Sequence, residues 1–225
     1  MRIDPDVLIP SLIAAGLILL ISFPVHEASH AWTAWRLGDG TARMFGRITL
    51  NPVAHFDPIG GLMLLASSLL GVGIGWAKPT PVNTANLRGG PQGEAIVAFA
   101  GPASNLVLAA LGAIPFRLLD NARDNGTNVP DMVLLVLAYF VLINVALLLF
   151  NLLPVPPLDG SKVLFSFMTP RQRYQWRPVL EQYGIFFFLI VAFVPILPGG
   201  ETIFQFVFDK IGWPIVSFLT GRDFG

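Results

Sequence analysis

The sequence contains no cysteine, and only 12% of its 225 residues are charged. Without cysteine there can be no disulfides, thiolate ligands or cysteine nucleophiles, so a metal ion would have to be held by histidine or carboxylate side chains. Acidic and basic residues balance at 14 each, so no positive charge excess indicates a nucleic-acid partner. Histidine is also scarce, with three residues, His26, His30 and His55.

Long uncharged apolar runs fill most of the chain, which is 54% hydrophobic with a mean hydropathy of +0.66. The runs cover residues 7–25, 58–77, 95–116, 132–158 and 184–200, with a weaker one at 211–220. Most reach the roughly 18 to 20 residues that a membrane span needs. We therefore predict an all-α polytopic membrane protein with about five to six membrane segments, forming one domain over residues 1–225.

A His-Glu-x-x-His pattern directly follows the first apolar run. If the helix continues through Trp35, His26 and His30 lie one turn apart on one face and can bind a single cation. Glu27 lies about 100° round the helix, where we expect a general base and not a ligand. Such short patterns also occur in inert surface helices, but ionisable groups beside a lipid span are costly and indicate function. The chemistry indicated is hydrolysis of an amide bond.

A second polar motif, Asn-Leu-Leu-Pro-Val-Pro-Pro-Leu-Asp-Gly at 151–160, contains the best candidate for a third metal ligand. Its prolines stop the preceding helix, so Asp159 is expected on unwound backbone. Such backbone is tolerated at membrane depth only where it is buried in protein or lines a wet cavity. Taken alone, Asp159 could equally be an interfacial residue after a proline-terminated helix; the histidine pair favours the ligand interpretation.

The two motifs together resemble those of the site-2 protease family of intramembrane zinc metalloproteases. Three further motifs are similar to those of its compact bacterial members without a PDZ or CBS domain. They are Leu-Asn-Pro-x-x-His-x-Asp-Pro-x-Gly from residue 50, Gly-Trp-Ala-Lys-Pro-x-Pro-Val-Asn from residue 75 and Ala-Gly-Pro-x-x-Asn from residue 100. The resemblance implies one Zn²⁺ per chain held by His26, His30 and Asp159, with Glu27 as general base and Asn151 binding the scissile carbonyl or its oxyanion.

The resemblance also implies a function and a cellular location. The protein would be an endopeptidase of regulated intramembrane proteolysis, cutting membrane-protein substrates within or next to their transmembrane segments, in the lipid bilayer of a bacterial inner membrane. Its catalytic core would cover about residues 7–165, followed by C-terminal membrane segments at about 184–220. Homo-oligomerisation stays open. The alternative is a non-proteolytic metal-binding membrane protein, such as a transporter or scaffold, but a transporter would carry ionisable residues in several spans.

The positions of the motifs predict how the spans run. Both catalytic motifs lie at the C-terminal ends of their helices, so these two helices must run in the same direction, with an odd number of crossings between them. Of the two intervening apolar runs, the shorter and glycine-rich one at 58–77 is predicted to be re-entrant. Basic residues then gather on one side, which places the active site toward the cytoplasm and the N-terminus outside.

Residues 41–51 are compatible with a short β-like stretch. An exposed edge there, or at residues 79–83, could pair with an unwound substrate segment, although a simple surface turn fits either segment equally well. His55 is expected to order its own loop by a hydrogen bond and to stay outside the metal site. Asn105 is expected to pack between helices.

Overall fold

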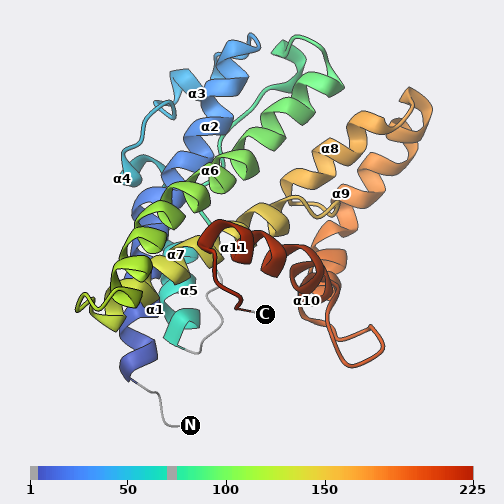
Figure 1. Cartoon of the computed structure of the whole chain (residues 1–225). Coiled ribbons are helices and arrows are strands. Elements are labelled where there is room, and N and C mark those ends of the chain that lie inside the picture. The colour runs from blue at the N-terminus through green and yellow to red at the C-terminus, as the bar shows by residue number, and fades with distance from the viewer. Residues whose placement is uncertain (1–4, 70–74, 225) are drawn as a thin grey trace.

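Helices joined by loops make up the part of the chain that the computed structural model describes, residues 5–69 and 75–224 (Figure 1). No strand occurs within these ranges. Five segments are long and apolar enough to cross a membrane, and a shorter apolar helix lies between the first two. The prediction of an all-α polytopic membrane protein is therefore confirmed.

The first span combines three continuous helical elements, and the last span does the same. The first consists of α1 (Pro5–Leu17), the π-helical turn η1 (Ile18–Ser22) and α2 (Phe23–Arg36). The three middle spans are α6 (Pro91–Asp124), α7 (Asp131–Asn151) and α9 (Pro170–Phe193). The last consists of α10 (Ile203–Val207), η3 (Phe208–Gly212) and α11 (Trp213–Thr220).

The long helix α6 is the centre of the packing. It lies against α2, α7 and the short helix α8 (Asp159–Phe167), and Figure 1 shows it beside α2 along much of its length. Small side chains let the helices approach closely, because Ala109 and Ala113 of α6 pack against Val141 and Val145 of α7. Through its contacts with α2 and α7, α6 lies against both helices whose ends carry the predicted catalytic motifs.

The apolar run at 58–77 does not form a complete span. Its helix, α5 (Pro58–Leu69), has 12 residues and is about 18 Å long, against about 30 Å of hydrocarbon. Residues 75–78 return along α5, and Lys78 N–H donates to His55 C=O at 2.8 Å, so the segment comes back to where it began. The prediction of a re-entrant segment is confirmed in this respect; residues 70–74 lie outside the described ranges.

Two glycines allow this return. A Cβ on Gly60 would lie 2.1 Å from the Trp76 carbonyl oxygen, and a Cβ on Gly75 would lie 2.4 Å from Leu64 Cβ. Since these distances are far below van der Waals contact, only glycine permits so close an approach of the two chain segments. The glycine content of the run thus has a structural reason.

The predicted β-like stretch at 41–51 is wrong. Residues Thr41–Met44 form the helical turn α3, and the residues after it form turns and bends up to α4 (Pro52–His55). The cause is the Asp39 carboxylate, which accepts the Thr41 N–H at 3.1 Å and the Thr41 hydroxyl at 2.6 Å. These local bonds favour a helical turn over an extended ladder.

The apolar run that starts near residue 184 continues a helix that begins earlier. Helix α9 begins at Pro170, where Thr169 and Gln172 form a capping box. Hydropathy alone misses this start, because the first half of the helix is rich in arginine and glutamine. The fourth span is therefore a helix with one polar and one apolar half.

Candidate metal centre

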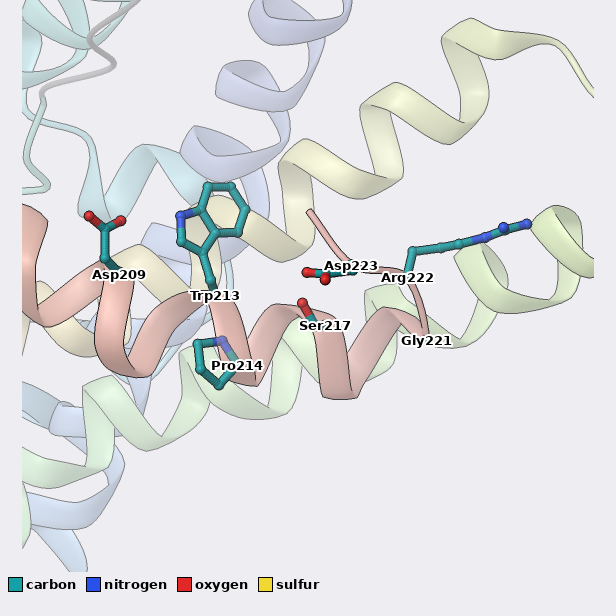
Figure 2. A pocket seen from close by; sticks show the side chains of 7 residues that line it. All are labelled: Asp209, Trp213, Pro214, Ser217, Gly221, Arg222 and Asp223. Carbon is teal, nitrogen blue, oxygen red and sulfur yellow. The ribbon is translucent and has the colours of Figure 1, made fainter. Parts of the chain in front are cut away.

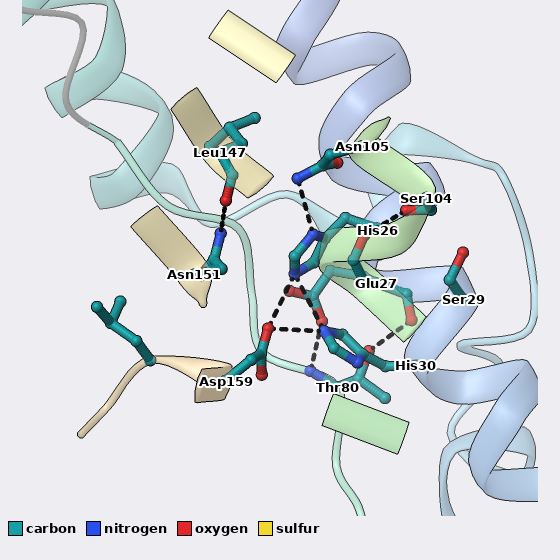
Figure 3. A network of polar contacts seen from close by, with 12 residues as sticks. His26, Glu27, Ser29, His30, Thr80, Ser104, Asn105, Leu147, Asn151 and Asp159 are labelled. Atoms are coloured by element: carbon teal, nitrogen blue, oxygen red, sulfur yellow. Dashed lines mark hydrogen bonds and ion pairs between the residues drawn. The ribbon is translucent and has the colours of Figure 1, made fainter. Parts of the chain in front are cut away.

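Two histidines on α2 and one aspartate on α8 converge on a single point (Figure 3). His26 and His30 lie one helical turn apart, with their Nε2 atoms 3.0 Å from each other. Asp159 Oδ2 lies 3.3 Å from His26 Nε2 and 3.1 Å from His30 Nε2. All three side chains are buried. The three residues that sequence analysis selected as ligands thus form one cluster, held by two separate elements.

The proline-rich segment before α8 delivers Asp159 to this point. The α7 helix ends at Asn151, and the chain then follows an irregular path until Asp159 opens α8 as its first residue. Ser161 closes this junction, because its hydroxyl donates to Leu158 C=O at 2.7 Å. Asp159 is therefore not on unwound backbone, where it was expected, but is the first residue of α8, directly after the irregular segment.

Contacts from α6 orient the two imidazoles. His30 Nδ1 lies 2.7 Å from Val97 C=O, which can only accept, so this ring nitrogen carries the proton and Nε2 keeps its lone pair for the cluster. His26 Nδ1 lies 3.1 Å from the Asn105 amide nitrogen. The other end of that amide, Oδ1, is buried without a partner. A half-turn of the amide would let this oxygen accept from a His26 Nδ1–H, which leaves His26 Nε2 free to bind a metal.

Gly101 gives the two imidazoles their space. A Cβ at this position would lie 2.3 Å from His30 Nε2 and 2.6 Å from His26 Nε2. Only a glycine lets the α6 backbone pass so close to the nitrogen atoms that face the cluster. The chain therefore keeps an open space where a methyl group would otherwise stand.

The charge at the cluster is that of an ionised carboxylate. Burial opposes ionisation of Asp159, and the positive charge of Lys162 favours it. Lys162 Nζ lies 3.2 Å from Oδ1, whereas Oδ2 faces the histidines.

Two imidazoles and one carboxylate suit zinc, and three protein ligands with a further open position are typical of catalytic zinc sites. The residues present fit a zinc ion.

Glu27 lies beside this cluster without belonging to it (Figure 3). Its carboxylate Oε2 accepts the backbone N–H of Thr80 at 2.7 Å, and its backbone carbonyl accepts the Thr80 hydroxyl at 3.0 Å. Glu27 is therefore held by the segment that returns from α5, whereas the histidines are held by α6.

Two other predicted residues take different positions. Asn151 stands half-buried at the end of α7, where its Nδ2 donates one hydrogen to Leu147 C=O at 2.9 Å. This leaves a second amide hydrogen for another acceptor. His55 lies outside the cluster, and its Nε2 bonds to Thr49 C=O at 2.8 Å, as predicted for a residue that orders its loop.

Sequence analysis missed three contributions to the site. Asn105 was expected to pack between helices, but it contacts His26. Gly101 precedes it in the Ala-Gly-Pro-x-x-Asn motif, and this spacing was the available signal. Thr80 contributes through its backbone N–H, so its side-chain type could not indicate this role in the sequence.

A separate cavity lies at the C-terminal end of the chain (Figure 2). It measures about 730 Å³ and is lined by Asp209, Trp213, Pro214, Ser217, Gly221, Arg222 and Asp223. It shares no lining residue with the histidine cluster and is therefore not part of that site.

The chain was compared with known proteins and protein families. The model of Peptidase family M50 matches residues 115–194. A protein of Bacillus subtilis (strain 168) named "Putative zinc metalloprotease YwhC" is 37% identical over 209 residues, covering 91% of this chain and 85% of the relative. "Putative zinc metalloprotease Rip2" of Mycolicibacterium smegmatis is 34% identical over 197 residues, covering 86% of this chain and 70% of the relative.

A more distant relative is "Putative zinc metalloprotease Rip3" of Mycobacterium tuberculosis, which is 31% identical over 163 residues, or 71% of this chain and 33% of the relative. No solved structure matches the chain. The match to the Bacillus subtilis protein covers most of both chains, and the five apolar helices identify an integral membrane protein. The chain therefore belongs to peptidase family M50, the family of the site-2 proteases.

Proposed function

We propose that this protein is a zinc-dependent intramembrane endopeptidase that hydrolyses peptide bonds within or next to the transmembrane segments of other membrane proteins. The observation that carries this proposal is the convergence of His26, His30 and Asp159 beside Glu27, on and against a membrane-spanning helix. Membership in family M50 and the names of the relatives support the same chemistry.

Each residue has a distinct part in the proposed reaction. When bound, zinc supplies Lewis acidity, which polarises the scissile carbonyl and makes water a better nucleophile. His26, His30 and Asp159 would hold the ion through Nε2, Nε2 and Oδ2. Glu27 would take the proton of the attacking water on its carboxylate and later pass it to the leaving amine. Asn151 would donate its second amide hydrogen to the developing oxyanion.

The surroundings of the cluster support hydrolysis over ion transport. A transporter needs ionisable groups along a path through the membrane. Within the described spans, the buried ionisable side chains are the two histidines and Glu94, and Glu94 is held by Arg177 at 2.7 Å. The proposed substrates are single-span proteins of a bacterial inner membrane, cut at a site open toward the cytoplasm.

Purified protein in detergent tests the proposal with a panel of single-span membrane substrates. Cleavage is expected with wild type, lost in Glu27→Gln, lost on adding a chelator and restored by zinc. Loss of the general base should lower the rate by about 10²- to 10⁴-fold. The exposed Glu201→Gln is the matched control and should cleave like wild type. Zinc-loaded protein that cleaves no substrate, or cleavage that survives in Glu27→Gln, would contradict the proposal.

A further inference from the structure

An extended segment passes next to Glu27 after returning from α5. This segment, residues 75–83, is here called the strap. The guanidinium of Arg47, a buried residue, donates to Lys78 C=O at 2.9 Å and to Pro79 C=O at 2.7 Å. At the far end, Asn83 N–H donates to Asp39 Oδ2 at 2.7 Å. The strap is therefore fixed at both ends, with Thr80 between the two anchors.

The local sequence isolates one backbone donor in the strap. Proline has no N–H, so Thr80 carries the single N–H of the Pro79-Thr80-Pro81 triplet. The proline rings fix φ at their own positions, and a residue before proline is confined to extended conformations. The two prolines thus restrict the conformations of the backbone on both sides of the Thr80 N–H.

This isolated donor points at the carboxylate of Glu27. The distance of 2.7 Å from Thr80 N to Glu27 Oε2 is that of a charge-assisted hydrogen bond. The Thr80 hydroxyl adds a second bond, to the Glu27 carbonyl at 3.0 Å. The strap is thereby tied to both the side chain and the backbone of one residue of α2, and the glutamate is held in one orientation.

Several backbone groups of the strap are already bonded within the chain. The N–H groups of Lys78, Thr80 and Asn83 bond within the chain, and the carbonyls of Lys78 and Pro79 accept from Arg47. A ladder needs regularly spaced free donors and acceptors along one edge. The bonds described here favour a supporting role for the strap over the strand pairing considered for residues 79–83.

We propose that Thr80 is a positioning residue for Glu27, and that the strap exists in part to present its N–H to that carboxylate. This inference rests on the proposed function, because it assigns a partner to the proposed general base. A general base must lie within hydrogen-bond reach of the proton it takes, and a displacement of 1 Å costs about 10²-fold in rate.

The contact can be tested without any substrate. Thr80→Pro removes both bonds to Glu27. Val82→Pro is the matched control, because it adds a proline to the same strap at a residue that packs against the cluster of Ala34, Leu87 and Val97. In a double-mutant cycle, the Tm of each variant is measured both in the wild-type background and together with Glu27→Ala. Thr80→Pro should lower Tm in wild type by at least about twice as much as in the Glu27→Ala background. An equal Tm change for Thr80→Pro in the two backgrounds would show that Thr80 and Glu27 do not interact.

Kinetics then test the positioning role. Thr80→Pro should lower kcat by about 10- to 100-fold with KM and zinc affinity within about twofold of wild type, since Glu27 is not a ligand. Thr80→Val keeps the N–H and should lose about threefold or less, and Thr80→Ser should match wild type. Val82→Pro should also keep its activity. A Thr80→Pro variant with more than half of the wild-type kcat would overturn the inference.

The two proposals fail in different ways. If wild type cleaves no substrate, the proposed function fails, while the thermal cycle still decides whether Thr80 holds Glu27. If wild type is active and Glu27→Gln is not, but Thr80→Pro keeps its kcat, the function stands and the positioning role is wrong.

Discussion

At the scale of single residues, Gly101 shows how little room the cluster has. In Gly101→Ala the new methyl group would stand 2.3 Å from His30 Nε2, in the space where a metal ion would bind. We expect a loss of zinc affinity of at least about 10-fold, with a parallel loss of cleavage, because the imidazoles must turn away. Competition with a chromogenic chelator measures the affinity.

Gly40→Ala is the control for this substitution. A Cβ at Gly40 would have no neighbour within 4 Å, so the variant should bind zinc like wild type. Unchanged zinc affinity in Gly101→Ala would mean that the cluster does not hold the ion through the two Nε2 atoms.

Residue chemistry explains which parts of the site could be predicted from sequence. Few side chains bind zinc, so the histidine pair and Asp159 stand out in an apolar chain. Thr80 contributes a backbone N–H, which any residue except proline could supply, and the carbonyl of Val97, which any residue could supply, orients His30. Such contributions become visible only when the distance between chain segments is known.

At the scale of elements, Asp39 joins three parts of the chain that sequence patterns treat separately. Its carboxylate accepts from Thr41 of α3, from Asn83 at the end of the strap, and from Asn86 of the 3₁₀ turn η2 (Thr84–Asn86). Burial opposes ionisation, but these hydrogen bonds hold the pKa of the Asp39 carboxyl below its usual value.

The lowered pKa predicts a pH dependence with a definite sign. As the pH falls, the Asp39 carboxylate is protonated in the unfolded chain at a higher pH than in the folded protein. The ionised carboxylate therefore stabilises the fold fully above the unfolded-state pKa of about 3.9, and this stabilisation is lost as the pH falls below that value. In Asp39→Asn an amide NH₂ faces the Asn83 N–H, so the free energy of unfolding should fall by about 2 kcal/mol at pH 7. The Tm difference from wild type should narrow below about pH 4.

Thermal unfolding between about pH 3 and pH 7 measures this difference. The exposed Asp209→Asn serves as control and should follow wild type throughout. A Tm difference for Asp39→Asn that stays constant over this range would contradict the role of the carboxylate.

Element boundaries were predictable where hydropathy changes sharply and not where local hydrogen bonds decide. The re-entrant run was predictable from the odd number of crossings required between the two catalytic motifs and from its shorter length and its glycines. The structure agrees, because a helix as short as α5 cannot cross a bilayer. The turn α3 was not, since residues 41–51 carry β-compatible side chains but begin beside the Asp39 acceptor. The start of α9 was hidden for the related reason that capping, not hydropathy, sets it.

At the scale of the whole molecule, contacts gather most basic residues at one end. Arg88 N–H bonds to Leu37 C=O at 2.8 Å, which brings the end of α2 to the start of α6, and the Arg177–Glu94 ion pair brings the start of α9 to the same end. At the opposite end Arg222 pairs with Asp120 and Asp124. From the positive-inside rule we propose that the first of these ends faces the cytoplasm.

The absence of cysteine makes this orientation easy to measure, because one introduced cysteine is unique in the chain. Thr84 and Asn128 are exposed residues near the opposite ends. In intact cells a membrane-impermeant maleimide should label Asn128→Cys, and it should label Thr84→Cys only after permeabilisation. The reverse pattern would invert the proposed topology.

The separate attachment of Glu27 and of the histidines has a practical consequence. The histidines are oriented by α6, whereas the Glu27 carboxylate is bonded to the strap. A molecule whose strap has moved away from Glu27 would therefore still bind zinc but would be catalytically inactive. A stoichiometry of bound zinc counts loaded molecules, and a separate titration of active sites is needed to count the competent ones.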